Sequence, residues 1–197
     1  MTKSRLDDAA LDLLFHDAHT AHRYLDMVVS VDEVERIWAS VRWAPSTMNV
    51  QPLRLVIAES AEARAAVLEH LSGSNHDKAA AAPILAVVCA DTAFHDTLDR
   101  LVPHIENARD IFSDDAHRER TAREQTWLQS GYLILGLRGA GLGCGPMLGY
   151  DAAGLDNTFL AGTSLVSVMV LTIGVPDPDG YRPRQQRLDP HEVMLRR

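Results

Sequence analysis

The stretch WLQSGYLILGLRGAG, residues 127–141, is apolar on nearly every side of the helix that its composition predicts. A surface helix keeps a polar face, whereas a helix that is hydrophobic all round is buried. We therefore expect a long helix from about Asp114 to Ala140, with its second half at the centre of the fold.

Strand-like runs lie on both sides of this helix in the sequence. The segments are LRLVIA (53–58), PILAVVCA (83–90) and LVSVMVLTIG (165–174), and the second is apolar throughout, as in a buried strand. SVDEVERIWASVRWA (30–44) predicts a helix that begins with a capping box and ends at Pro45.

The remaining periodic segments complete the order of elements. Further helices are expected over 7–19 and 60–71 and from Asp151, while 91–112 is helix-like but broken by Pro103. Strands and helices do not alternate regularly, so the chain is predicted to be α+β, in a three-layer sandwich, and not a repeated βαβ array.

Composition limits the classes of function. The 197 residues suit one domain, 1–197, with an excursion at about 91–123 and a basic tail at about 178–197. A net charge of −8 argues against nucleic acid or an anionic membrane as a partner. No apolar run reaches the ~18 residues of a membrane span.

Features of the termini and cysteines indicate the compartment. The first residues are acidic where a signal peptide needs an apolar core. Cys89 and Cys144 are far apart and form no CxxC pair, which fits a reducing environment. We expect a cytoplasmic protein.

Several familiar motifs are absent or lie in the wrong context. Gly141-x-Gly143 follows a helix and is interrupted by Pro146, whereas a dinucleotide-binding motif follows a strand, so a glycine-rich helix exit beside a ligand is favoured. GTSLV (162–166) does not match the serine-hydrolase pattern, and HExxH is missing. The spacing of His16, His19 and His22 could hold a metal, but a solvated helix end is favoured and no metal is predicted.

Three polar stretches remain. WAPSTMNVQPLRLVI (43–57) places small hydrogen-bonding side chains and two prolines between a helix and a strand. SGSNHDK (72–78) carries Asn75 and Lys78 one helical turn apart, and the tail carries an arginine cluster able to bind a phosphate. Taken alone, each could also be a solvated loop or a frayed end.

Together and in this order, these stretches resemble the FMN-dependent nitroreductase family over nearly the whole chain. The resemblance implies a sandwich with a mainly antiparallel sheet around a long central helix. It assigns FMN contacts to His19, Thr20, His22, Arg23, Pro45, Ser46, Thr47, Asn49, Asn75, Lys78, Pro146, Met147, Leu148, Gly149, Arg184 and Arg187.

Within the family, VPHIENARDIF (102–112) and GPMLGYD (145–151) look most similar to the malonic semialdehyde reductase (3-hydroxypropanoate dehydrogenase) branch. That likeness implies reduction of a small semialdehyde acid. His104 and Arg109 are then candidates to hold the substrate carboxylate, although a surface arginine on a helix is an equally good description of Arg109.

The resemblance also implies the chemistry. NADH or NADPH would pass hydride to flavin N5, and a second small molecule would then take it, in a ping-pong scheme. Lys78 would stabilise the negative charge of the reduced flavin. The family's enzymes are homodimers with FMN at the interface, which fits an apolar helix at 127–142 that three short strands cannot cover.

Departures from the family pattern leave alternatives open. His19 and His22 replace arginines, so phosphate binding would rely on Arg23, Arg184 and Arg187 and weaken as pH rises through the histidine pKa, ordinarily about 6.5. A broad nitro or quinone reductase, a flavin storage or sensor protein, and a flavin-fragmenting enzyme remain alternatives.

Overall fold

The computed structural model describes residues 5–197 and contains one four-stranded sheet within them. The strands are β1 (Leu53–Ile57), β2 (Ile84–Asp91), β3 (Gly143–Met147) and β4 (Leu165–Gly174). Their order across the sheet is β1-β2-β4-β3, and every neighbouring pair is antiparallel. The expected antiparallel sheet is therefore confirmed.

The structure contains the helices that the periodicity of the sequence predicts and two that were not predicted, one at 74–80 within the polar stretch after 71 and one at 190–193 in the tail. The helices are α1 (Asp8–Leu11), α2 (Val31–Val41), α3 (Ala61–Leu68), α4 (Ser74–Ala80), α5 (Leu98–Leu101), α6 (Asp115–Gly139), α7 (Ala152–Thr158) and α8 (Pro190–Val193). Short 3₁₀ turns cover Thr47–Asn49, Phe94–Thr97, Ala108–Phe112 and Pro178–Gly180, and a π-helical turn covers Asp12–His16. Among the described helices, none has the length and apolarity to cross a membrane.

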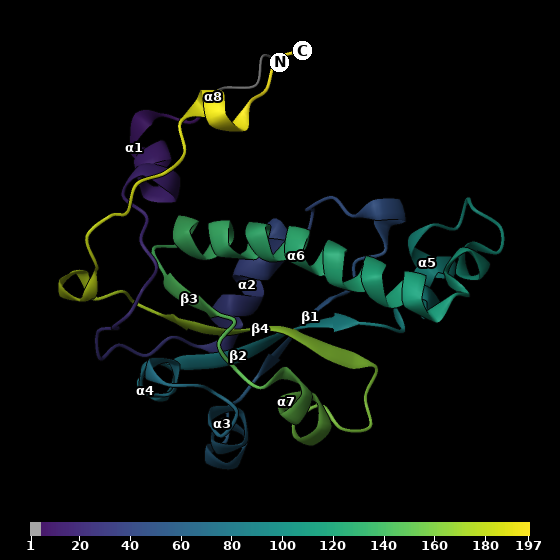
Figure 1. The fold of residues 1–197 in the computed structure, drawn as a ribbon, viewed down its shortest axis with the longest axis horizontal. Coiled ribbons are helices and arrows are strands. Elements are labelled where there is room, and N and C mark those ends of the chain that lie inside the picture. Colours follow the sequence, from purple (N-terminus) through teal and green to yellow (C-terminus); the bar gives the residue numbers. More distant parts are fainter. Residues whose placement is uncertain (1–4) are drawn as a thin grey trace.

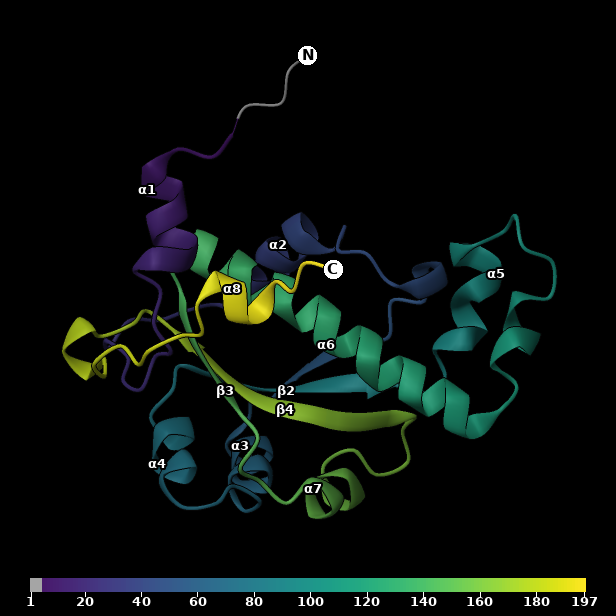
Figure 2. The same cartoon turned by 45° about the horizontal axis from the view of Figure 1, so that its top comes forward.

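The sheet is the middle layer of three. Helices α2 and α6 lie on one face, and α3, α4 and α7 lie on the other (Figures 1 and 2). All eight residues of β2 are buried, because this central strand is covered on both faces. Val88 faces the α6 side and Val87 the α4 side, in separate hydrophobic clusters.

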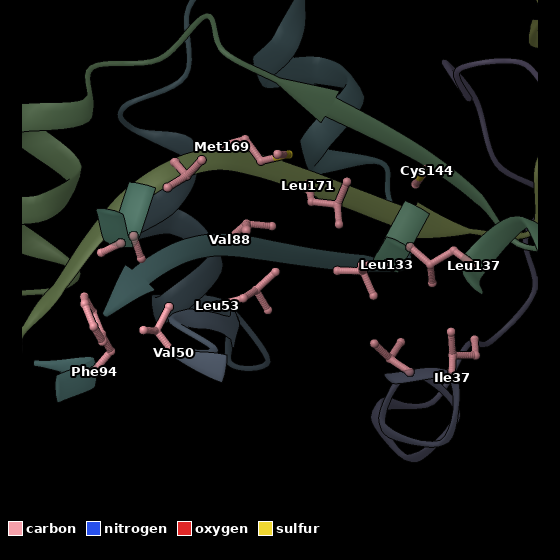
Figure 3. Close-up of a cluster of buried hydrophobic side chains, with 14 of the residues drawn as sticks. Ile37, Val50, Leu53, Val88, Phe94, Leu133, Leu137, Cys144, Met169 and Leu171 are labelled. Carbon is pink, nitrogen blue, oxygen red and sulfur yellow. The ribbon is translucent and has the colours of Figure 1, made fainter. Parts of the chain in front are cut away.

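The core beneath α6 is the larger of the two clusters. Figure 3 shows Leu133 and Leu137 of α6 and Ile37 of α2 gathered against the sheet residues Val88 and Leu171. Both α6 leucines are fully buried. This packing fixes the long helix across the sheet and so fixes the loops at both of its ends.

Helix α6 is not buried on all sides within one chain, contrary to the expectation of a fully enclosed helix. Trp127, Leu128 and Tyr132 are 46%, 43% and 40% exposed. One sheet and one neighbouring helix can cover only one side of a cylinder. The opposite side keeps an apolar stripe, which we call the α6 stripe: Trp127, Leu128 and Tyr132.

Strand β3 was expected to be a glycine-rich helix exit. The sequence GCGPM has low strand propensity, but β3 is an edge strand, where proline is tolerated. A Cβ on Gly143 would lie 2.8 Å from Pro176 Cβ and 2.9 Å from Ala21 Cβ. Glycine is required at 143 because these three segments of the chain approach one another closely, and not because the backbone must be flexible there.

Candidate functional site

A basic cleft lies between residues 16–23, which we call the N-terminal segment, and the C-terminal tail. It has a volume of about 340 Å³. It is lined by Ala18, His19, Thr20, His22, Arg138, Arg182, Pro183, Arg184, Gln185 and Arg187. Five residues that the sequence predicted for FMN are therefore brought together, namely His19, Thr20, His22, Arg184 and Arg187.

Direct contacts hold the two walls of this cleft together. The Arg184 guanidinium donates to the backbone carbonyls of His16 and Ala18 and lies 3.2 Å from His19 Nε2. The His19 ring stacks on Tyr181, with centroids 4.6 Å apart. The tail is thus attached to the N-terminal segment by a cation and an aromatic pair.

Positive charge dominates the cleft. Burial lowers the pKa of His22 below its usual 6.5, and the positive charges of Lys78 and Arg182 lower it further. His22 is therefore neutral at neutral pH in the free chain. Of these two charges, Lys78 of α4 has the larger effect on the pKa of His22.

Arg23 lies outside the lining of the cleft. Its guanidinium donates to Asp177 at 2.6 Å and 3.1 Å. The hydrogen bond from Arg23 is the main reason that the pKa of Asp177 lies below its usual range. This pair links the N-terminal segment to the start of the tail, so Arg23 already has a carboxylate partner.

Asn75 and Lys78 lie on α4, next to the chain that leaves β3. The Asn75 amide donates to the Gly149 carbonyl at 3.3 Å, and the Ser72 backbone N–H donates to it at 3.1 Å. A Cβ on Gly149 would lie 2.7 Å from Asn75 Nδ2. A larger residue at 149 would therefore displace the Asn75 amide from this contact between the two predicted segments.

The predicted residues of segment 146–149 differ in what they can offer. Pro146 and Leu148 are exposed, and Leu148 is 65% accessible. The Met147 side chain is buried in the cluster on the α4 side of the sheet. Met147 can therefore present only its backbone to a ligand.

The loop with Pro45, Ser46, Thr47 and Asn49 lies elsewhere. The Thr47 backbone N–H donates to Gln125 Oε1 of α6 at 2.8 Å, and Asn49 Nδ2 donates to the carbonyl of Leu101, at the end of α5, at 3.1 Å. Figures 1 and 2 both place α5 and α4 at opposite ends of the molecule. One chain therefore does not bring this loop to Asn75, Lys78 and the basic cleft.

The two predicted substrate residues belong to the α5 end. His104 is exposed in the segment after α5. Arg109 is exposed and forms an ion pair with Asp96 of the preceding 3₁₀ turn. They share an end of the molecule with the loop at 45–52.

Two cleft arginines were missing from the predicted site. Arg182 belongs to the basic tail cluster that the sequence displays. Arg138 is the only charged residue of the apolar stretch 127–141, a signal that could have singled it out. Arg138 donates to the Leu14 carbonyl at 3.1 Å, and its buried Nε has no hydrogen-bond partner within residues 5–197.

Comparison with known proteins decides the family. The sequence model of the Nitroreductase family matches residues 17–175. This chain belongs to the nitroreductase family. Proteins of Streptomyces griseus and Leptothrix cholodnii, provisionally named NADH dehydrogenase/NAD(P)H nitroreductase, are both 42% identical to it. The alignments cover 96% of both chains for the first, and 93% of this chain and 94% of the relative for the second.

A solved structure has the same fold. The crystal structure of a provisionally named nitroreductase from Exiguobacterium sibiricum, in complex with FMN, aligns with a TM-score of 0.81 over 100% of both chains. The two sequences are 21% identical, so this likeness establishes the architecture. The expected nitroreductase-like α+β sandwich is confirmed.

Proposed function

We propose that this nitroreductase-family protein is an FMN-dependent NAD(P)H oxidoreductase that acts as a homodimer. The observation that carries the proposal is the division of the predicted site. The basic cleft, Asn75 and Lys78 lie at one end of the folded molecule, and the loop at 45–52 lies at the opposite end. Two copies in opposite orientation would complete two sites.

The basic cleft fits the phosphate of FMN. Arginine guanidinium groups bind phosphate oxygens through charge-assisted hydrogen bonds. Arg182, Arg184 and Arg187 line the cleft together with Arg138, whose buried Nε has no hydrogen-bond partner in residues 5–197. His22 would take up a proton beside the bound dianion.

Asn75 and Lys78 fit the edge of the flavin ring. The Asn75 amide offers donors and an acceptor to the pyrimidine edge. When bound, FMN supplies hydride transfer between NAD(P)H and the second substrate. The Lys78 ammonium would favour negative charge on the adjacent ring, and so would assist that transfer.

The second copy would supply the loop and cover the α6 stripe. Trp127, Leu128 and Tyr132 form an apolar surface that a single chain leaves in water. Aromatic and large apolar side chains are typical of the buried centre of an interface. Pro45, Ser46 and Thr47 of one copy would then lie against the flavin of the other.

For the acceptor, we propose a small semialdehyde acid such as malonic semialdehyde, reduced to 3-hydroxypropanoate. The segments 102–112 and 145–151 support this choice through their resemblance to that branch. Arg109 would have to exchange its Asp96 partner for the substrate carboxylate, or leave this role to His104. The names of the two relatives favour a second candidate, a nitro compound.

Rates of NADH and NADPH oxidation by the FMN-loaded protein test these proposals. Malonic semialdehyde, nitrofurazone and a quinone are compared as acceptors. A clear preference for the semialdehyde supports the proposed substrate, whereas faster nitrofurazone turnover supports the second candidate. Bound FMN without any NAD(P)H oxidation would indicate a storage or sensor protein, and loss of flavin absorbance under oxygen would indicate flavin fragmentation.

A further inference from the structure

The loop at 46–51 is held in a strained backbone conformation. Met48, Asn49 and Gln51 have φ angles of 47°, 55° and 43°. Left-handed angles are uncommon for residues other than glycine. Three such residues within four positions persist only where the surrounding structure fixes them, and such strain concentrates at functional sites.

Hydrogen bonds inside the loop do not explain its placement. The Gln51 backbone N–H donates to Ser46 Oγ at 3.2 Å, and Gln51 Nε2 donates to Asn49 Oδ1 at 2.7 Å. These bonds shape the loop. They do not attach it to the rest of the molecule.

Gln125 of α6 supplies one external anchor. Its Oε1 accepts the Thr47 backbone N–H at 2.8 Å. Helix α6 is packed on the sheet through its buried leucines, so this contact ties the loop to the core of the fold. Thr47 lies immediately before the first left-handed residue.

Arg54 of β1 supplies a second anchor. Its Nη1 donates to the Gln51 carbonyl at 2.9 Å, and its Nη2 donates to Asp91 Oδ2 at 2.6 Å. Asp91 is only 9% exposed, and its other oxygen accepts the Ser164 hydroxyl and the Ala93 backbone N–H. Arg54 therefore has a fixed orientation when it reaches the last strained residue.

We propose that Gln125 and Arg54 are positioning residues that hold loop 46–51 in its strained form from either end. What they position it for rests on the proposed function, in which the loop contacts the flavin of the partner copy. Because the loop already has its strained conformation in the free chain, little conformational entropy is lost in ordering it when the flavin binds. Neither side chain needs to touch the flavin.

Gln125→Met tests the first anchor, because methionine keeps the length of the side chain and loses the strong acceptor. Gln125→Glu keeps an acceptor oxygen. Gln129→Met is the matched control. Gln129 lies one turn later on α6 and accepts the backbone N–H of Leu53 in β1 at 3.1 Å, outside the loop. Arg54→Lys tests the second anchor, because lysine keeps the charge beside Asp91 without the planar fork.

We measure three quantities: amide hydrogen exchange of residues 46–51 in the FMN-free protein, the FMN dissociation constant, and the melting temperature. Gln125→Met is expected to speed exchange in the loop and weaken FMN roughly 3- to 10-fold, the range of one net hydrogen bond. Gln125→Glu is expected to restore slow exchange. Arg54→Lys is expected to act like Gln125→Met, and Gln129→Met to lower the melting temperature while leaving FMN affinity within about 2-fold.

Two results would overturn the proposal. One is wild-type exchange and FMN affinity in Gln125→Met. The other is an equal loss of FMN affinity in Gln129→Met, which would make the effect one of general stability. If the wild-type protein retains no FMN, the proposed function is refuted. Hydrogen exchange in the FMN-free chain still decides, in that case, whether Gln125 holds the loop.

Discussion

Arg187→Ala should separate recognition of the FMN phosphate from recognition of the flavin ring. Arg187 lines the basic cleft and is exposed, and among residues 5–197 its guanidinium donates only to the neighbouring carbonyls of Gln185 and Gln186. Arg184, in contrast, holds the tail to the N-terminal segment, so its loss would disturb the cleft itself. Arg187 is therefore the cleaner probe of phosphate binding.

The magnitude follows from the setting of Arg187. A hydrogen bond to a charged group contributes about 1.5–3 kcal/mol. Because Arg187 is exposed and water competes for its donors, we take the lower end, about 1.5 kcal/mol, which corresponds to roughly 10-fold in affinity. Riboflavin lacks the phosphate, so its affinity should change by less than about 2-fold.

Titration of the FMN-free protein, followed by flavin fluorescence, gives both dissociation constants. Arg196→Ala is the control, because Arg196 is a tail arginine that does not line the cleft. It should leave both affinities unchanged. Equal weakening of FMN and riboflavin by Arg187→Ala would refute the role of Arg187 in phosphate binding.

Three further predictions follow from the same geometry. Lys78→Ala should weaken FMN and slow flavin reduction by NAD(P)H roughly 10- to 100-fold, as loss of a charged donor implies, and wild-type stopped-flow rates would remove Lys78 from the site. The FMN-free protein should lose stability as pH falls below about 6.5, because the pKa of His22 is lowered in the folded state and the unfolded chain therefore takes up the proton first. His22→Gln should reduce the change of melting temperature between pH 7 and pH 5, and an unchanged pH dependence would contradict the prediction. Co-expression of Lys78→Ala and Asn49→Ala chains should restore about one quarter of the sites, because half of randomly paired dimers are mixed and each mixed dimer holds one intact site, whereas no restoration would argue against a site shared between copies.

The sequence predicted the elements whose signals are local. Helix α2 follows from its single apolar stripe and from its N-cap: the Ser30 hydroxyl accepts the Glu33 backbone N–H, which is one of the two hydrogen bonds of the expected capping box. Strand β2 follows from an unbroken apolar run. Helix α6 was located to within a residue or two because its length and apolarity leave few alternatives.

The rest depends on contacts between distant residues. The sequence of strand β3 predicted a glycine-rich helix exit, because Gly143 is required by close contacts with Pro176 and Ala21, which lie more than 30 and 120 residues away in the sequence. The Asp177 partner of Arg23 could not be predicted, because a lone arginine in the sequence does not reveal a carboxylate 154 residues away, and the phosphate role of Arg23 stays a prediction. Gln125 and Gln129 look like ordinary polar positions of a helix until their backbone partners in the loop and in β1 are known.

Visible absorption spectroscopy tests the central claim most directly. The purified protein is incubated with FMN, desalted, and titrated with NADH or NADPH without oxygen. The account predicts a retained flavin band that bleaches on addition of the nicotinamide. A protein that retains no flavin after desalting, or a retained band that does not bleach with either donor, would contradict the assignment as an FMN-dependent oxidoreductase.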